Sequence, residues 1–420
     1  MNAVLDELKW RGLVYQSTDE AALAAHLDEG PVTGYVGFDP SAPSIHFGNL
    51  VQLMVWRRLQ AAGHKPLLLV GGATGLIGDP RMSSERNLNP KEIVEQWVER
   101  IRSQVSRFVD FDGSNGAEVV NNYDWTKDLG TLDFLRDVGK YFSVNRMLAR
   151  DVVASRLESG ISYTEFSYIL LQSLDYRELY RTKGCTLQTG ASDQWGNISS
   201  GVELIRRSEG GKVHGLCTPL LTKADGSKFG KTESGTVWLD STMTSPYAFH
   251  QFFLNAEDAK VIDYLKVFSD RDRDEIDQLD HLTQTEPHRR AAQKALADDI
   301  TDLVHSVAER EAAVDAAQAL FGRGDLSALP SQTLQAVMNE VGLSQVSGTE
   351  LPTIVDALTD AKVVASKGAA RRAVAEGGAY LNNQKVTDPE QRLTADHLLD
   401  GRFALLRRGK KTLGALEFTA

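Results

Sequence analysis

The sequence predicts an α/β protein that begins with a parallel sheet, and three observations support this prediction. The segments 33–39, 65–72 and 117–124 have strand patterns, and 65–72 is apolar on both faces, as a buried strand is. Segments with helical periodicity lie between them. The chain has 420 residues, a length that corresponds to about two to four domains. Of these residues, 42% are hydrophobic and 25% are charged, which is an ordinary composition for globular domains. Alternating strands and helices form a Rossmann-like parallel sheet with helices on both faces.

Helix signals separate the predicted strands. The segment 17–20 has the spacing of a capping box, and the helix that it opens ends at Gly30. Asn49 is placed to cap a second helix, which ends at Gly63. Asn89 and Pro90 open a third helix, whose apolar residues recur at helical spacing. The remaining predicted elements are helices at 131–142, 144–158 and 164–182 and a strand at 185–190.

The pattern changes after residue 222. The segment 223–323 begins with a lysine-bearing loop and continues as charged helical sequence. The segment 324–350 contains no Lys or Arg and is rich in Ser, Gln and Gly, which is typical of a linker with one short helix. The segment 351–420 returns to a mixed α+β pattern. We therefore expect a Rossmann-like domain over 1–222, a loop and helical domain over 223–323, a linker, and a small α+β domain over 351–420.

Charge is distributed unevenly along the chain. The net charge is −11, which argues against a generic polyanion binder. Residues 351–420 hold 11 Lys and Arg against 8 Asp and Glu, whereas the preceding 350 residues hold 35 against 49. The tail is therefore compatible with local nucleic-acid binding, although an excess of this size is also ordinary for a protein surface.

The cysteine content and the apolar segments exclude several classes of protein. Cys185 and Cys217 have no further Cys or His at zinc-ligand spacing, so we expect no metal site. Two cysteines in a chain of this length are typical of a reducing compartment, and we expect the cytoplasm. No apolar segment has the 18 or more residues of a membrane span, and the N-terminus lacks the apolar region of a secretory signal.

The turn after the first strand, FDPSAPSIHFGNL, is suited to binding an anion. Backbone N–H groups at a helix N-terminus attract phosphate, and Ser41 and His46 would add donors. Taken alone, the pattern is more often a capped helix with an incidental histidine.

The turn after the second strand, VGGATGLIGDPR, contains four glycines that allow close approach of the backbone. Their spacing differs from that of a dinucleotide-binding turn. Asp79 follows this strand and would pair with a substrate ammonium group, but an aspartate that stabilises a turn is the alternative.

The segment KADGSKFGKT at 223–232 resembles the end of a P-loop, but Asp225 stands where a P-loop requires glycine. A strand pattern also follows it, where a P-loop requires a helix. A glycine-bearing loop with Lys223, Lys228 and Lys231 remains, which is suited to binding phosphates or is simply a solvated basic loop.

Polar residues mark one face of the helix predicted at 164–182. Tyr168, Gln172 and Asp175 share this face, and the surrounding sequence is apolar, which favours a helix buried against a pocket. In the strand at 33–39, Tyr35 and Asp39 share one face.

These motifs together resemble the class I aminoacyl-tRNA synthetases, and most closely the bacterial tyrosyl-tRNA synthetases. The resemblance covers nearly the whole chain and rests on YVGFDPSAPSIHFGNL, GGATGLIGDP, YTEFSYILLQSLD, GASDQWGNI and KADGSKFGKTESG. The segment SKGAARRAVAEGGAYLNNQKV is similar to a small RNA-binding domain first known from a ribosomal protein. Asn49 replaces the second histidine of the "HIGH" motif and KFGKT replaces KMSKS, as in other tyrosine enzymes. The loop at 81–86 lacks an expected lysine.

The resemblance implies an ATP-dependent ligase with tyrosine and tRNA(Tyr) as substrates. The carboxylate of L-tyrosine would attack the α-phosphorus of ATP, forming tyrosyl-adenylate and pyrophosphate, and the tyrosyl group would then pass to the 3′ end of the tRNA. ATP would act with Mg²⁺, with no tightly bound cofactor. The resemblance also implies a homodimer without membrane contact, joined at an apolar surface around 125–150.

The resemblance assigns roles to residues at matching positions. The expected catalytic residues are Ser41, His46, Lys228 and Lys231. The expected tyrosine-binding residues are Tyr35, Asp79, Tyr168, Gln172, Asp175 and Gln194. The expected ATP-binding residues are Asp39, Gly48, Asn49, Asp193 and Lys231. The expected tRNA-binding residues are Lys367, Arg371, Arg372, Arg407, Arg408 and Lys410.

Two alternatives remain open at this point. A non-catalytic RNA-binding protein built on a synthetase body would have lost its phosphate-binding residues, whereas His46, Gly48 and Lys228 are present. A tryptophan-specific synthetase would bind an indole, whereas Tyr35 and Asp175 favour a phenol.

Overall fold

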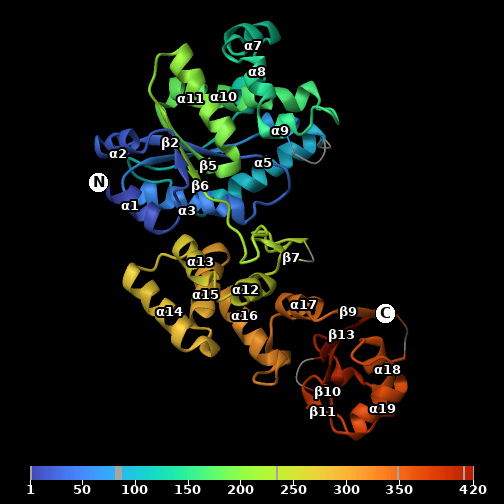
Figure 1. The fold of residues 1–420 in the computed structure, drawn as a ribbon. Helices are drawn as coiled ribbons and strands as arrows, with labels where there is room; N and C mark the ends of the chain where they lie inside the picture. The colour runs from blue at the N-terminus through green and yellow to red at the C-terminus, as the bar shows by residue number, and fades with distance from the viewer. Residues whose placement is uncertain (1, 81–87, 233–234, 348–349, 410–411, 420) are drawn as a thin grey trace. The chain divides into compact units, whose positions relative to one another are not determined.

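The structure is a computed structural model, and it describes residues 2–80, 88–232, 235–347, 350–409 and 412–419. The chain folds into two compact units (Figure 1). The first comprises Met1–Met243 and Glu257–Ala292, and the second comprises Thr244–Ala256 and Gln293–Ala420.

The first unit is built on a sheet of six strands, as the α/β pattern predicts. The strand order is β1-β6-β5-β2-β3-β4, and only β1 is antiparallel to its neighbour. The short strand β1 and the buried strand β6 were not predicted from the sequence. The strands are β1 (Gln16–Ser17), β2 (Thr33–Phe38), β3 (Lys65–Val70), β4 (Glu118–Asn121), β5 (Cys185–Ala191) and β6 (His214–Thr218).

Helices cover both faces of this sheet. On one face, Tyr35 and Leu67 pack with Tyr176 of α10 and Ile205 of α11. On the other face, Gly34 lies against Trp56 of α3, where a Cβ would overlap the indole ring. The helices of this unit are α1 (Ala3–Trp10), α2 (Glu20–Asp28), α3 (Phe47–Ala61), α4 (Thr74–Ile77), α5 (Lys91–Val105), α6 (Tyr123–Thr126), α7 (Thr131–Asp137), α8 (Val144–Leu148), α9 (Asp151–Ala154), α10 (Tyr163–Lys183), α11 (Trp195–Ser208), α13 (Val261–Phe268) and α14 (Arg273–Thr285).

The cap of α3 differs from the prediction. His46, and not Asn49, is the N-cap residue, and Asn49 occupies the third helical position. The Asn49 side chain accepts a hydrogen bond from the backbone N–H of His46, which completes a capping box. The prediction was wrong because an asparagine is a common cap, whereas a histidine can also act as one through its ring nitrogen.

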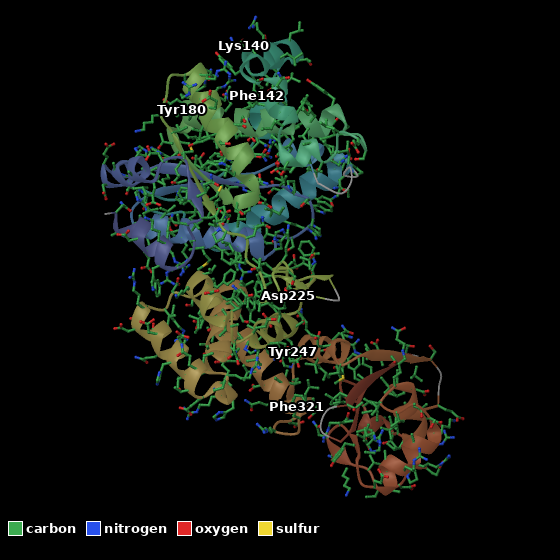
Figure 2. All side chains as sticks on the ribbon, viewed as in Figure 1. Lys140, Phe142, Tyr180, Asp225, Tyr247 and Phe321 are labelled. Carbon is green, nitrogen blue, oxygen red and sulfur yellow. The ribbon has the colours of Figure 1, made fainter. Side chains whose placement is uncertain are left out.

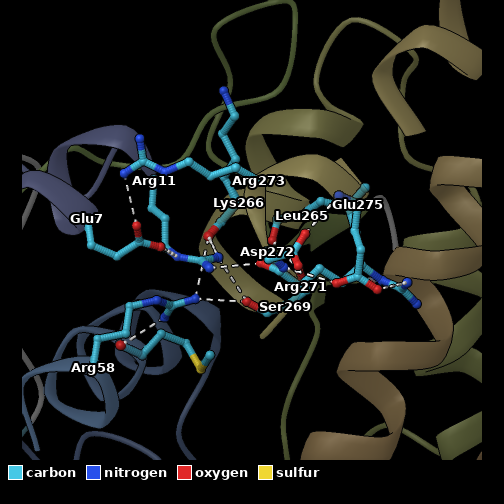
Figure 3. Close-up of polar contacts among 11 residues, drawn as sticks. Glu7, Arg11, Arg58, Leu265, Lys266, Ser269, Arg271, Asp272, Arg273 and Glu275 are labelled. Atoms are coloured by element: carbon cyan, nitrogen blue, oxygen red, sulfur yellow. Dashed lines mark hydrogen bonds and ion pairs between the residues drawn. The ribbon is translucent and has the colours of Figure 1, made fainter. Parts of the chain in front are cut away.

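Two arginines hold α13 against α1 and α3 (Figure 3). Arg11 donates hydrogen bonds to the carbonyl oxygens of Lys266 (2.8 Å) and Ser269 (3.0 Å), and Arg58 donates to that of Ser269 (2.9 Å). Burial, together with the charge of Arg11, lowers the pKa of Arg58 to about 9. Carbonyl groups at a helix C-terminus attract cations, so the C-terminus of α13 has a fixed position beside α3.

The second unit contains a five-stranded mixed sheet in the order β11-β10-β12-β13-β9. Ala404 and Leu406 of β12 pack on a core formed with α18 and α19, while Phe403 and Leu405 pack on a core formed with α16 and α17. The helices are α12 (Pro246–Leu254), α15 (Ala291–Val304), α16 (Val307–Leu320), α17 (Ser331–Glu340), α18 (Ile354–Asp360) and α19 (Lys367–Ala375). The strands are β9 (Leu343–Ser347), β10 (Ala379–Leu381), β11 (Gln384–Lys385), β12 (Phe403–Arg408) and β13 (Thr412–Thr419).

The segment 324–350 is not the linker that its composition suggested. It contains α17 and β9, and β9 pairs in parallel with β13 over five residues, from Leu343 to Ser347. Leu334, Val337 and Met338 of α17 are buried in the same core as Phe403. The segment lacks basic residues, but it supplies apolar residues at helical spacing. It therefore belongs to the C-terminal sheet, and a boundary at residue 350 would divide that sheet.

No helix in the described part of the chain is both long enough and apolar enough to cross a membrane. Among the described residues, no group of three or more His, Cys, Asp or Glu side chains is arranged to hold a metal ion.

Candidate active site

A cleft of about 560 Å³ opens at the carboxyl ends of β2, β3 and β5 in the first unit. Helix α10 and the loop 221–230 complete its walls. Tyr35, Tyr168 and Asp175 are buried in the wall, whereas His46 and Lys228 are exposed. The cleft therefore has a buried polar end and an end accessible to solvent.

Asp175 is the ionisable group of the buried end, where it is only 2% exposed. Burial raises the pKa of this carboxyl group from 3.8 to about 8. Hydrogen bonds from Asn122 Nδ2 (3.0 Å) and Trp125 Nε1 (2.9 Å) act in the opposite direction. Two fixed donors thus hold an acidic group that accepts a further hydrogen bond readily.

Several buried polar atoms in the cleft wall have no hydrogen-bond partner within the described chain. They are Tyr35 Oη, Gln52 Oε1, Gln172 Oε1 and Gln188 Oε1. Burial, and then the charge of Asp175, raise the pKa of Tyr35 well above its usual value, so its hydroxyl remains a donor. Leaving such an atom unpaired costs about 1–3 kcal/mol, so the wall is suited to a polar ligand.

Asp39 and Tyr168 connect the end of β2 to α10. Tyr168 Oη and Thr74 Oγ1 donate to the two carboxylate oxygens of Asp39, each at 2.6 Å. A Cβ at position 71 would overlap the side chains of both Asp39 and Thr74. Gly71, which directly follows β3, therefore leaves room for the side chains of Asp39 and Thr74.

Asp79 stands beside two amides at the end of β5. Gln194 Nε2 donates to one carboxylate oxygen (3.0 Å) and Asn197 Nδ2 approaches the other (3.3 Å). Arg150 in turn donates to Asn197 Oδ1 (2.6 Å). This arrangement fixes a carboxylate at the edge of the cleft.

The ring of His46 has a defined orientation at the exposed end. Its Nδ1 accepts a hydrogen bond from the backbone N–H of Gly48 (3.1 Å). Because Nδ1 is the acceptor, a neutral His46 carries its proton on Nε2. A Cβ at position 48 would lie 2.9 Å from His46 Cε1, so the glycine leaves room for the ring. His46 thus combines a helix cap with a donor N–H group.

The loop that carries Lys228 is a short hairpin with Asp225 near its tip (Figure 2). The Phe229 N–H donates to the Leu221 carbonyl (3.0 Å), and the Phe229 ring stacks on Tyr264 of α13 with 4.0 Å between ring centroids. Tyr264 Oη also donates to the Thr222 carbonyl (2.9 Å). Helix α13 therefore holds the base of the hairpin.

The structure brings most of the predicted tyrosine and ATP residues together in this cleft. Those that line it are Tyr35, Asp39, Ser41, His46, Gly48, Asn49, Asp79, Tyr168, Gln172, Asp175, Asp193, Gln194 and Lys228. The side chain of Lys231 and the loop 81–86 lie outside the described residues.

Four residues of the site were not predicted from the sequence: Thr74, Asn122, Trp125 and Gln188. Asn122 directly follows β4, so the rule that ligands bind beyond the carboxyl ends of strands points to it. The turn after that strand contains no glycine or histidine signal. Trp125 and Gln188 have no comparable signal in the sequence, because their roles depend on where α6 and β5 lie.

The structure separates the predicted tRNA-binding residues. Lys367, Arg371 and Arg372 lie on α19, where Lys367 pairs with Asp356 and Arg371 pairs with Glu390. Consecutive residues of a strand point to opposite faces of its sheet.

Arg408 therefore faces the same side of the sheet as Leu406 and the core of α19, whereas Arg407 faces the other side. The guanidinium of Arg407 lies 4.0 Å from the centre of the Tyr380 ring. Lys410 lies outside the described residues.

Two family models match the chain. Residues 27–322 match the model described as tRNA synthetases class I (W and Y). Residues 333–414 match the tyrosine–tRNA ligase SYY-like C-terminal domain. The second match begins within α17, in agreement with the place of α17 and β9 in the C-terminal unit.

The chain is similar over its whole length to bacterial proteins named tyrosine–tRNA ligase. It is 66% identical to that of Cutibacterium acnes, over 99% of this chain and all of the relative. It is 56% identical to that of Streptomyces avermitilis, over the full length of both.

Solved structures show the same fold. The C-terminally truncated mitochondrial tyrosyl-tRNA synthetase of Aspergillus nidulans is 30% identical, with a TM-score of 0.69 over 76% of this chain and 95% of that chain. The tryptophanyl-tRNA synthetase of Plasmodium falciparum, at 12% identity, has a TM-score of 0.54 over 79% of this chain and 88% of that chain, which shows a shared fold alone.

Proposed function

The chain belongs to the class I tRNA synthetases of the tryptophan and tyrosine family, and from that premise we propose that it joins L-tyrosine to tRNA(Tyr) at the expense of ATP. The observation that carries this proposal is the buried hydroxyl of Tyr35 beside the carboxyl group of Asp175. A donor and an acceptor in one buried wall match the hydroxyl of a phenol. A substrate without that hydroxyl, such as phenylalanine, would leave both groups unpaired, and a site of this kind therefore rejects it.

The amino end of tyrosine would be held by a second group of residues. Asp79 supplies a carboxylate for the ammonium group, and Gln172 supplies a buried amide oxygen that has no partner within the described chain. Tyr168, oriented by Asp39, adds a hydroxyl. The amide of Gln194 would lie near the substrate carboxylate, which leaves that carboxylate free to attack the α-phosphorus.

The exposed end of the cleft would bind ATP, which enters as its magnesium complex and as a substrate. Gly48, Asn49 and Asp193 would lie along the adenosine, and Asp39 would approach it from β2. Ser41 and His46 would donate to the leaving phosphates, and Lys228 and Lys231 would neutralise the charge that develops on pyrophosphate. Catalysis would come from positioning and charge stabilisation, because the substrate's own carboxylate is the nucleophile.

In the second step, a hydroxyl of the tRNA's 3′-terminal adenosine attacks the tyrosyl carbonyl carbon, and AMP leaves. Cations of the C-terminal unit would contact the tRNA backbone, namely Lys367, Arg371 and Arg372 on α19 and Arg407 and Arg408 on β12. We propose the same role for Lys410, which lies outside the described residues. Such contacts weaken as salt concentration rises.

We further propose a cytoplasmic homodimer. Leu132 is 81% exposed and Val144 is 59% exposed, and both lie in the segment 125–150 where an apolar interface is expected. Contiguous exposed apolar surface is typical of a protein interface, and these two side chains would contribute to it. The free thiols of Cys185 and Cys217 are consistent with a reducing compartment.

Amino-acid-dependent exchange of pyrophosphate into ATP tests the first step, with tyrosine, tryptophan and phenylalanine compared at equal concentrations. We expect exchange with tyrosine alone, followed by charging of tRNA(Tyr). Exchange that depends on tryptophan would show that the chain has the tryptophan specificity of its family and not the tyrosine specificity. No exchange with any amino acid, together with tRNA binding, would favour a non-catalytic RNA-binding protein.

A further inference from the structure

Gln104 lies on α5 and does not line the cleft, yet its side chain contacts two segments that carry residues of the phosphate end. Its Oε1 accepts a hydrogen bond from the backbone N–H of Ile45 (2.9 Å) and lies 3.2 Å from Ser44 Oγ. Its Nε2 approaches Asp240 Oδ2 (3.3 Å). One carboxamide therefore contacts the residues before His46 and the segment that follows the Lys228 loop.

The two segments also pair with each other. The Leu239 N–H donates to the Ile45 carbonyl (3.1 Å), and the Asp240 N–H donates to Ser44 Oγ (3.1 Å). His46 and Trp238 form an antiparallel bridge at the end of this pairing. The backbone just before His46 is therefore held by two groups. Residues 238–240 pair with it, and Gln104 contacts both it and Asp240.

The second segment leads back to the lysine loop. The Val237 N–H donates to the Gly230 carbonyl (3.0 Å), two residues after Lys228. Asp240 is itself fixed, because its Oδ1 accepts hydrogen bonds from the N–H (2.8 Å) and hydroxyl (2.7 Å) of Thr242. A displacement of Gln104 would therefore change the position of His46 relative to Lys228.

We propose that Gln104 is a positioning residue that sets the separation of His46 and the Lys228 loop, and thereby the rate at which pyrophosphate is formed. This inference rests on the proposed function of the cleft. Val94, Val98, Ile101 and Val105 already bury one face of α5, so the carboxamide is not needed to attach that helix.

The first experiment compares Gln104→Ala with a matched control, Gln60→Ala. Gln60 is also a glutamine that joins separate backbone segments: its amide donates to the Asp110 carbonyl (2.6 Å) and accepts from the Asp110 N–H (2.9 Å). It does not line the cleft.

We expect Gln104→Ala to slow single-turnover tyrosyl-adenylate formation about 10-fold, because a misplacement of about 1 Å can lower a rate about 10²-fold and a smaller shift lowers it less. Tyrosine affinity should stay unchanged. Gln60→Ala should reduce thermal stability without changing that rate. Equal rates for the parent and Gln104→Ala would overturn the proposal.

A side-chain exchange tests the contact itself. Gln104→Glu keeps the acceptor for Ile45 but places a carboxylate against that of Asp240, and Asp240→Asn alone places two amides together. In the double variant, the amide of an asparagine at 240 donates to the carboxylate of a glutamate at 104. The hydrogen bond is restored, and its direction is the reverse of that in the parent. We expect both single variants to be slow and the double variant to recover most of the parent rate. Failure of the double variant to recover, in a folded protein, would contradict the role of this contact.

A double-mutant cycle with His46→Asn tests the route of the effect. An asparagine keeps a side-chain cap for α3 while the imidazole N–H is lost. We expect Gln104→Ala to have almost no further effect on the rate in the His46→Asn background. Independent, multiplicative effects would show that Gln104 does not act through His46. If the parent supports no tyrosine-dependent exchange, the proposed function fails instead, and the two failures are distinguishable.

Discussion

The six-stranded sheet and the five-stranded sheet use their strands in different ways. In the first unit, β2, β3 and β5 end at one cleft, where polar side chains such as Asp175 and Gln188 are buried. In the second unit, both faces of β12 are covered by apolar cores, through Phe403 and Leu405 on one side and Ala404 and Leu406 on the other.

Topology explains this difference. Parallel strands bring all their carboxyl ends to the same edge, so loops from several strands meet there. Antiparallel strands alternate in direction and distribute their connections over both edges. The first sheet therefore builds a site at its edge, and the second provides a packed support for surface cations. Substitutions at the first should change activity, and substitutions at the second should change stability.

The largest expected effect is the loss of stability in Phe403→Ala. The ring projects from β12 and is fully buried against helices of the second unit. Truncation of such a ring lowers the free energy of unfolding by about 3–5 kcal/mol. Denaturant unfolding measures the loss, and single-turnover tyrosine activation should be unchanged while the variant is folded. The contrasting variant is Tyr35→Phe, which should keep its stability and lose discrimination against phenylalanine. Reduced tyrosine activation in folded Phe403→Ala would break the comparison.

His46→Ala should follow, with a decrease of about 10²–10³ in the rate of adenylate formation, since it removes a preorganised donor to the phosphates. It also removes the cap of α3, which costs about 0.5–2 kcal/mol. His46→Asn separates the two roles, because it should lower the rate and preserve the unfolding midpoint. Stopped-flow activation and thermal unfolding of both variants check this expectation, and unchanged rates in both would remove His46 from the mechanism.

Asp175→Asn should lower kcat/KM for tyrosine activation by about 10- to 100-fold, because it replaces a carboxyl oxygen with an amide donor, and a buried donor left unpaired costs about 1–3 kcal/mol. Affinity for ATP should change little. Exchange kinetics at varied tyrosine and ATP concentrations separate the two effects. A variant with unchanged kcat/KM for tyrosine would exclude Asp175 from the phenol site.

The same residue gives a pH dependence of stability in the absence of tyrosine. The pKa of Asp175 is raised from 3.8 to about 8 in the folded chain, so the folded state holds this proton more tightly than the unfolded state. Its contribution to stability is complete below about pH 4 and is lost as pH rises toward 8. The unfolding midpoint of the parent should therefore fall relative to that of Asp175→Asn between about pH 5 and 8. A constant difference over this range would contradict the raised pKa.

The smallest expected effects concern tRNA binding. Arg372→Ala and Arg408→Ala remove exposed cations from the side of the sheet that carries α19. Each should weaken tRNA binding several-fold and reduce the salt dependence by about one phosphate contact. Arg407→Ala, on the opposite face and beside Tyr380, should have less effect. Filter binding at two or more salt concentrations measures all three, and a larger effect of Arg407→Ala would place the RNA on the other face.

The sequence by itself determined the α/β class, the parallel strands and most of the cleft. Strand periodicity and glycine turns are local signals that can be identified in the sequence. Because ligands bind beyond the carboxyl ends of parallel strands, these signals also predict where the site lies. The face shared by Tyr168, Gln172 and Asp175 follows from helix geometry alone, and the structure places all three in the cleft wall.

Only the tertiary structure decided which residues hold the site together. Asn122 and Trp125 contact Asp175 across 53 and 50 positions of sequence, and Gln104 contacts Asp240 across 136. Composition also failed for β9, because a strand without basic residues resembles a linker until its partner β13 is in place. Hydrogen bonds between distant segments depend on how the elements pack, and packing leaves no periodic pattern in the local sequence.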